Sequence, residues 1–245
     1  MSFALWTGLV TCAISFIGCL ILCLIDFRTD ENDRNIVEFE DDLAGASISS
    51  FYEFNTIFWL LTILCFTLYG AFLPFNYIAA GFFTETYFVG IDKHEAQHLA
   101  GIYMSIPFFI SAFLIPIFGI LIDKYGQRAY LAMGASICGL ISFIFFYFAS
   151  PIVSLILLGC TYSLFASIIW PSISLVVKKS VVGFAYGVTT AIQNFGLVIF
   201  PMIVASIYSS TNDYYSTLGF FIFMMILSIL ISIFLIGENN KMRSN

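Results

Sequence analysis

Seven long apolar stretches dominate this sequence and constrain its fold more than any other feature. A helix needs about 20 predominantly apolar residues to cross the hydrocarbon core of a bilayer. The stretches lie at residues 3–25, 55–80, 99–122, 129–149, 152–177, 183–208 and 214–236. Of the 245 residues, 60% are hydrophobic and only 10% are charged, whereas about a quarter of the residues in soluble domains are charged. We therefore predict an all-α membrane protein with seven transmembrane helices, in contact with membrane lipid.

The connections between these stretches separate one leading helix from a run of six. The long connection is residues 26–53. Its part from Asp26 to Asp42 carries eight acidic and two basic residues, and the net charge of −6 of this part equals that of the whole chain. The predicted parts are a leading transmembrane helix at 1–25, an acidic cytosolic loop at 26–53, a six-helix half-bundle at 54–237 and a cytosolic tail at 238–245.

Lys and Arg residues in the connections predict the orientation, because cytosolic loops are enriched in them. When successive connections are assigned to alternating sides of the membrane, Lys93 is the single basic residue on one side. The other side receives Arg28, Arg34, Lys124, Arg128, Lys178, Lys179, Lys241 and Arg243. We expect a lumenal or extracellular N-terminus and a cytosolic C-terminus. Residues 1–25 lack the positive start of a signal peptide, and their apolar run is long for one, which favours a spanning helix.

Charge and cysteine usage argue against several functions. The sequence has no basic stripe, so nucleic acid is not an expected partner. All six cysteines lie in apolar stretches, without CxxC spacing or a Cys/His cluster, and neither a metal site nor a cofactor is expected. No Ser-His-Asp or phosphate-loop constellation occurs, so we do not expect an enzyme.

One motif lies between the third and fourth stretches, on the basic side. It reads Gly119-Ile-Leu-Ile-Asp123-Lys124-Tyr-Gly126-Gln-Arg128. Gly119 would permit close helix contact, and Gly126 would supply a turn that needs free backbone torsions. Asp123 can cap a helix or pair with a base, while Lys124 and Arg128 would anchor the turn at the cytosolic surface. A plain polar turn with a charge pair is the alternative interpretation.

This motif resembles the signature loop of the major facilitator superfamily, G-x-L-x-D-[RK]-x-G-x-[RK], at every specified position. In that superfamily the loop follows the second helix of each six-helix half. Residues 55–236 thus resemble the C-terminal half of a twelve-helix transporter, and residues 3–25 resemble its sixth helix. The resemblance implies an alternating-access carrier in which this loop takes part in gating.

Further motifs resemble a subfamily of lysosomal dipeptide transporters. They are Leu73-Pro74-Phe75, Ala166-Ser-Ile-Ile-Trp170-Pro171, Ala185-Tyr186-Gly187 and Gln193-Asn194-Phe-Gly196-Leu197 with Pro201. The resemblance implies a uniporter that exports dipeptides from the lysosome, or another endomembrane compartment, to the cytosol. It also implies a glycosylated single-span accessory protein as a partner. The alternative is a non-transporting membrane scaffold or partner subunit with the same fold, and a seven-helix receptor is a third possibility that the signature loop disfavours.

Polar and aromatic residues on proline-bent helices are the candidates for substrate contact. Carrier cavities lie near the midplane between the two halves, and polar groups turned to lipid would lack partners. An indole could stack on a peptide bond, and amides could bind its carbonyl groups. Ordinary packing and helix joining by buried amides is the alternative interpretation. The candidates are Tyr69, Asn76, Trp170, Gln193 and Asn194.

Four other residues have simpler interpretations. Gly183 and Gly187 have the spacing of a helix-packing surface. His94 and His98 are expected in the outer loop, where they could titrate at lumenal pH, although a solvated turn is the simpler interpretation.

The spans contain no Asp, Glu, Lys or Arg near their middle, a position where proton-driven carriers usually keep one. Transport is therefore facilitative, or the titrating group belongs to a half that this sequence lacks. Six helices alone would expose a polar cavity face to lipid, which is costly. We expect a missing N-terminal half or a second subunit, so that the chain is a fragment of a longer transporter, pairs with a separate half, or dimerises.

Overall fold

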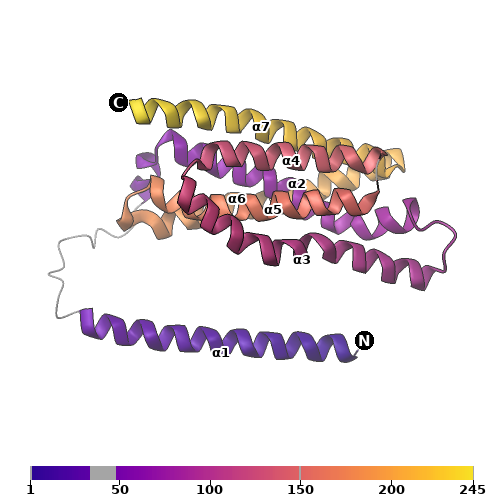
Figure 1. Cartoon of the computed structure of the whole chain (residues 1–245), viewed down its shortest axis with the longest axis horizontal. Coiled ribbons are helices and arrows are strands. Elements are labelled where there is room, and N and C mark those ends of the chain that lie inside the picture. The colour runs from indigo at the N-terminus through magenta and orange to yellow at the C-terminus, as the bar shows by residue number, and fades with distance from the viewer. Residues whose placement is uncertain (1, 34–47, 149, 245) are drawn as a thin grey trace. The chain divides into compact units, whose positions relative to one another are not determined.

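The computed structural model describes residues 2–33, 48–148 and 150–244 and is built from helices (Figure 1). Seven of them are long and apolar enough to cross a membrane, and the described residues form no strand. The predicted all-α fold with seven membrane-spanning helices is therefore confirmed. The chain divides into two compact units, Met1–Ala44 and Gly45–Asn245.

The first unit contains α1 (Ser2–Asp33), whose apolar span is Leu5–Arg28. Every side chain of this span is exposed, which suits a helix in contact with lipid. The helix continues past its predicted end at residue 25 because no Gly or Pro interrupts residues 26–33. Residues 34–47, which include much of the predicted acidic loop, lie outside the described residues.

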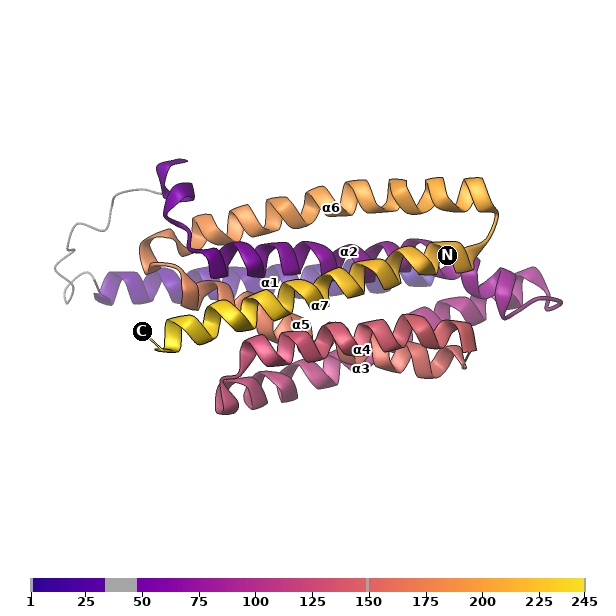
Figure 2. The same cartoon turned by 90° about the horizontal axis from the view of Figure 1, so that it is seen from above.

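The second unit is a bundle of six helices in which successive helices run antiparallel. They are α2 (Thr56–Thr86), α3 (Lys93–Tyr125), α4 (Arg128–Phe148), α5 (Pro151–Val176), α6 (Val182–Thr211) and α7 (Tyr214–Ser244), with short 3-10 turns at Ile48–Glu53 and Lys179–Val181. Helix α2 packs against α3, α5, α6 and α7. Figure 2 shows α6 along one edge of the bundle and α3 and α4 along the other. We call the end where α3 joins α4 and α5 joins α6 the basic end, and the opposite end the far end.

Helix α3 begins earlier than its apolar stretch alone predicts. Asp92 precedes it as the N-cap, and its Oδ2 accepts a hydrogen bond from the backbone N–H of His94 at 3.0 Å. Such a cap satisfies a donor that the first helical turn would otherwise leave unpaired. His94 and His98 therefore lie in the first turns of α3 and not in a loop.

Phenylalanine rings fill the far end of the bundle. Phe75 of α2 is 1% exposed, and its ring centroid lies 5.5 Å from that of Phe143, 5.2 Å from that of Phe146 and 5.9 Å from that of Phe221. These partners come from α4 and α7, so one cluster joins three helices. Phe143 and Phe221 meet Phe75 edge to face, an arrangement that is favourable for aromatic rings at these distances.

Hydroxyl groups also join the helices inside the bundle. The Ser228 Oγ of α7 donates to the Thr67 Oγ1 of α2 at 2.8 Å, and the hydroxyls of Thr62 and Thr189 lie 3.1 Å apart between α2 and α6. Such bonds hold helices together where lipid offers no competing partner.

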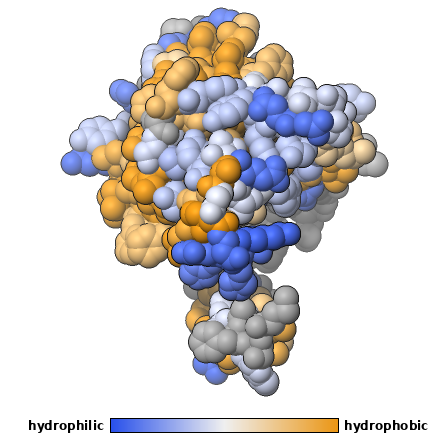
Figure 3. Space-filling view, turned by 90° about the vertical axis from the view of Figure 1, so that its right-hand side faces the viewer, coloured by the Kyte–Doolittle hydropathy of each residue, from blue (hydrophilic) through white to orange (hydrophobic). Residues whose placement is uncertain are grey.

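The outer surface of the bundle has the polarity of a membrane protein. Figure 3 looks on to the far end and shows hydrophilic residues on the end face with hydrophobic residues around them. Large apolar side chains on α3 are exposed, among them Phe109 at 68% and Ile120 at 74%. Lipid tails are the natural neighbours of such a surface.

Candidate substrate site and signature loop

Three helices meet at a hydrogen-bonded group of aromatic side chains. The indole Nε1–H of Trp170 on α5 donates to the Tyr69 Oη on α2 at 3.2 Å. The Tyr186 Oη on α6 donates to the backbone carbonyl of Trp170 at 2.9 Å, and the two rings lie 6.0 Å apart. We call Tyr69, Tyr162, Trp170 and Tyr186 the aromatic junction.

The junction continues toward α3 through stacked rings. Tyr162 lies 6.0 Å from Tyr69 in an edge-to-face arrangement, and it stacks on Phe72 at 4.5 Å. Phe108 of α3 lies 6.4 Å from Tyr162. Tyr69 is buried, while Tyr162, Trp170 and Tyr186 are partly exposed. Partly exposed aromatic rings offer an apolar face together with hydroxyl groups, a combination suited to binding a small organic molecule.

The two predicted aromatic candidates are thus in direct contact, but the three predicted amides behave differently. The Gln193 Oε1 accepts from the Cys65 thiol at 3.9 Å, one turn of α2 away from Tyr69. The Asn76 Nδ2 donates to the Phe72 carbonyl at 2.9 Å, within its own helix. Asn194 is exposed, and its side chain makes no hydrogen bond to the part of the chain that the structure describes.

Tyr162 and Tyr186 were not among the predicted site residues. Tyr186 lies seven residues before Gln193 on α6, a spacing that places both on one face of a helix. That spacing was a usable signal. The sequence signal for Tyr162 is weaker, because α5 is apolar on nearly all sides and its sequence does not indicate which face meets α2.

The signature loop forms a tight turn that only glycine accommodates without strain. Helix α3 is capped by Gly126, whose φ of 66° lies in the left-handed region, and its N–H donates to the Ile122 carbonyl at 2.8 Å. A side chain at this position would be strained, whereas glycine populates this region freely. Helix α4 starts two residues later, at Arg128.

Charged residues of the loop bind each other and a neighbouring ring. The Arg128 Nη2 donates to the Asp123 Oδ1 at 3.1 Å, with the Asp123 side chain 76% exposed and that of Arg128 20% exposed. The Lys124 Nζ lies 5.6 Å from the ring centre of Tyr125. A Cβ added at Gly119 would meet nothing within 4 Å, so Gly119 makes no close helix contact within the described chain.

Exposed small and polar residues form a stripe along α6 and another along α3. The first contains Gly183, Gly187, Thr190 and Asn194, and a Cβ built on either glycine would meet nothing within 4 Å. The stripe on α3 includes Gly101, which is also open. The packing surface predicted for Gly183 and Gly187 therefore has no neighbour among the described residues.

No group of three or more His, Cys, Asp or Glu side chains in the described ranges could hold a metal ion. The aromatic rings of the junction and the Gln193 amide of α6 can stack and form hydrogen bonds.

Comparison with known proteins bears on these features. A family model described as Major Facilitator Superfamily matches residues 3–201 and, in a second match, residues 75–245. The chain belongs to the major facilitator superfamily. The chain is therefore an integral membrane protein of this superfamily, and the motif at residues 119–128 spans the turn between α3 and α4.

Three relatives within this superfamily carry the same name, lysosomal dipeptide transporter MFSD1. The chain is 32% identical to the Bos taurus protein over 98% of its own length and 32% identical to the Homo sapiens protein over 100%. It is 33% identical to the Danio rerio protein over 80% of its length. The matches cover 50%, 51% and 41% of those relatives, so this major facilitator chain spans about half their length.

Proposed function

We propose that the chain is the C-terminal half of a major facilitator carrier that moves dipeptides from the lysosome, or a related compartment, to the cytosol by alternating access. The observation that carries the proposal is the aromatic junction on a chain similar over its whole length to lysosomal dipeptide transporters. The same relatives are about twice as long, which supports the assignment to a half.

The junction suits a small peptide because an aromatic ring face of the junction and a side-chain amide of α6 remain free to contact a ligand. The indole N–H of Trp170 is bonded to Tyr69, so Trp170 offers its ring face to a ligand. That face can stack on a peptide bond or an apolar side chain. Gln193, on the face of α6 that carries Tyr186, offers an amide to peptide carbonyl and N–H groups, whereas Asn194 lies on the exposed face that carries Gly187. No Asp, Glu, Lys or Arg lies near the middle of a span, so the charged termini of a dipeptide would be met by groups of the other half.

The stripe on α6 supports a missing N-terminal half as the partner. Small residues at four-residue spacing let two membrane helices approach closely, and Gly183 and Gly187 have no neighbour within the described chain. Thr190 and Asn194 on the same face would lack hydrogen-bond partners in lipid. A second subunit with the same fold would serve the same purpose. A glycosylated single-span accessory protein is a further partner in this proposal.

The mechanism we propose is uniport with a lumenal N-terminus and a cytosolic C-terminus. Uniport is supported by the spans, which lack a titrating carboxylate near their middle. The orientation is supported by Lys124, Arg128, Lys178 and Lys179, which gather at the basic end. In this arrangement the Asp123–Arg128 pair lies at the cytosolic face, where it would act as part of the gate.

A reconstituted system tests the function. Proteoliposomes would contain this chain with and without the six-helix N-terminal half of the human relative, and uptake of radiolabelled alanyl-leucine would be measured with and without a proton gradient. We expect saturable uptake only with both halves, at a rate independent of the gradient. Association of the halves without uptake would contradict the carrier function and support the scaffold alternative. Uptake that requires the proton gradient would contradict the uniport mechanism.

Variants locate the substrate contact in the same system. Trp170→Ala should raise the KM for dipeptide by about three- to tenfold, the value of a lost aromatic contact. Trp59→Ala is the matched control, because Trp59 is also partly buried but packs against Phe51 and Phe58 at the basic end. Equal KM values for the two variants would remove Trp170 from the substrate site.

A further inference from the structure

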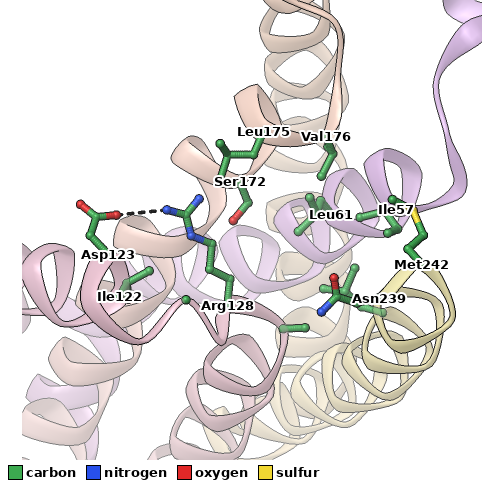
Figure 4. A pocket seen from close by; sticks show the side chains of 13 residues that line it. Ile57, Leu61, Ile122, Asp123, Arg128, Ser172, Leu175, Val176, Asn239 and Met242 are labelled. Carbon is green, nitrogen blue, oxygen red and sulfur yellow. Dashed lines mark hydrogen bonds and ion pairs between the residues drawn. The ribbon is translucent and has the colours of Figure 1, made fainter. Parts of the chain in front are cut away.

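A cavity of about 380 Å³ opens at the basic end of the second unit, beside the signature loop (Figure 4). Helices α2, α3, α4, α5 and α7 all contribute to its wall. Its volume lies within the range of about 300–1,000 Å³ that is usual for small-molecule sites. The cavity is separate from the aromatic junction, because none of the four junction residues lines it.

Arg128 gives this cavity a charged side chain with an unpaired hydrogen-bond donor. Its side chain is only 20% exposed, and its Nη2 binds Asp123 at 3.1 Å. Its Nη1 is buried and has no hydrogen-bond partner among the residues that the structure describes. Leaving a buried charged donor unpaired is costly, and a guanidinium is built to bind two oxygens at once.

The cavity itself offers little to neutralise this charge. Asp123 is the single acidic residue among those that line it, and the Asp123 side chain is 76% exposed, so solvent screens its interaction with Arg128. Ser172 also lines the cavity, but its hydroxyl donates to the Ile168 carbonyl at 2.6 Å, and Asn239 is neutral. An external anion is therefore the group that would complete the hydrogen bonding of Arg128.

The remainder of the wall is apolar. Ile57 and Leu61 of α2, Val176 of α5 and Leu235 of α7 line it, and Figure 4 shows Ile57, Leu61 and Val176 across the cavity from the guanidinium. A small soluble anion would leave this wall in contact with water. A ligand with an anionic head and an apolar tail would cover both parts.

We propose that this cavity binds a membrane phospholipid, with its phosphate on Arg128 and an acyl chain along α2 and α7. Phosphate binds a guanidinium through two parallel hydrogen bonds. The cavity lies at helix ends that carry basic residues, the level at which anionic head groups attract basic side chains. The proposal does not depend on which solute the carrier moves.

Native mass spectrometry of the full chain, released from a nonionic detergent, tests the proposal. The probes are 1-oleoyl lysophosphatidic acid, the uncharged 1-monoolein with the same acyl chain, and inorganic phosphate. We expect one saturable lysophosphatidic acid adduct, with affinity at least about tenfold above that of either other probe. Equal binding of monoolein would show that Arg128 contributes nothing, and equal binding of inorganic phosphate would show a site for a soluble anion. Either result overturns the proposal.

Three variants separate the contributions of the Arg128 charge, the cavity volume and the Asp123–Arg128 ion pair to lipid binding, and a fourth serves as the control. Arg128→Gln should weaken lysophosphatidic acid binding by about tenfold or more, because it removes the charged donor. Ala129→Leu should weaken it through volume alone, since Ala129 lines the cavity and is 6% exposed. Asp123→Asn should retain binding, because Arg128 is then free of its exposed partner.

The matched control is Lys178→Gln. Lys178 also lies at the basic end in an ion pair, with Glu53 at 3.1 Å, but its side chain is 77% exposed and lies outside the cavity. Thermal unfolding of each variant shows whether it has folded, and Ala129→Leu provides the test if Arg128→Gln does not fold. Equal weakening by Lys178→Gln and Arg128→Gln would reduce the effect to surface charge and overturn the site.

Discussion

Compared with the far end of the six-helix unit, which is filled by phenylalanine rings, the basic end is joined by polar contacts around a cavity. At the far end Phe75, Phe143 and Phe221 are each at most 1% exposed. At the basic end, the Asn55 Nδ2 donates to the Val176 carbonyl at 3.2 Å, and Glu53 pairs with Lys178 at 3.1 Å between side chains that are more than half exposed.

This difference indicates which end can rearrange. Close-packed rings lose many contacts at once when they separate, so the far end should behave as a rigid unit. Exposed ion pairs contribute only about 0–1 kcal/mol and can be exchanged for other partners. In a carrier that alternates between two states, the basic end is therefore the part that we expect to change its contacts.

The largest effect should come from breaking the packed end. Phe75→Ala should lower the free energy of unfolding by about 3 kcal/mol or more, because it leaves a large cavity among rings from three helices. Phe148→Ala is the control, since Phe148 is 86% exposed. Unfolding of both variants in detergent would be followed by circular dichroism. A change below about 1 kcal/mol for Phe75→Ala would show that the far end is not the rigid part.

The turn at the basic end should give the next largest effect. Gly126→Ala should destabilise the fold by about 1–2 kcal/mol because its φ of 66° is unfavourable for alanine. Gly119→Ala, seven residues earlier, should be neutral or stabilising, since the added Cβ meets nothing and alanine favours helices by about 1 kcal/mol over glycine. Unfolding in detergent separates the two, and equal effects would contradict the left-handed turn.

The number and approximate position of the helices could be predicted from the sequence, because a bilayer requires every spanning segment to satisfy its own backbone. The ends were less predictable, since a helix continues where the apolar run stops. Helix α2 runs to Thr86, past the predicted residue 80, through Thr84 and Glu85. Neither residue interrupts a helix, so apolarity marked the span and not the helix end.

Individual candidates for the site could be predicted, but not their partners. Tyr69 and Trp170 were predicted separately and share a hydrogen bond. Gln193 and Asn194 were predicted together, yet Gln193 bonds to Cys65 while Asn194 is exposed, because successive residues on a helix point about 100° apart. Which face meets a neighbour depends on packing, and helices that are apolar on all sides carry little sign of it in their sequence.

A smaller effect is expected at the link between α2 and α5. The Asn55 Oδ1 accepts from the Phe58 N–H at 2.8 Å, capping α2, while its Nδ2 donates to Val176. Asn55→Ala should cost about 1 kcal/mol through loss of the cap. Asn55→Asp keeps the cap and removes the bond to Val176, so its unfolding in detergent should show a smaller loss. If the two variants are equally destabilised, the cap contributes nothing and only the link matters.

The signature-loop ion pair should affect transport more than stability. Asp123→Asn replaces a carboxylate that is 76% exposed with an amide whose oxygen can still accept a hydrogen bond from Arg128, so its thermal unfolding should change little. Dipeptide flux in the two-half proteoliposomes should fall severalfold if the pair forms part of the gate. Glu53→Gln, which removes the other exposed pair at the basic end, is the comparison. Normal dipeptide flux in the Asp123→Asn variant would contradict the proposed gating role of Asp123.

The smallest effect concerns acid at the far end. The Asp213 carboxylate accepts from the backbone N–H groups of Tyr215 and Ser216 at 3.1 and 2.9 Å and from the Ser216 hydroxyl. Desolvation opposes the charged form, but these three hydrogen bonds outweigh it and lower the pKa of Asp213 below 3.8. Because the folded-state pKa is the lower one, its stabilisation is present above the unfolded pKa and is lost as the pH falls through the folded value. Asp213→Asn should therefore remove a small acid-dependent loss of stability, measured by unfolding below pH 4. An unchanged pH dependence would mean that the packed far end does not rely on this cap, which would sharpen its contrast with the polar basic end.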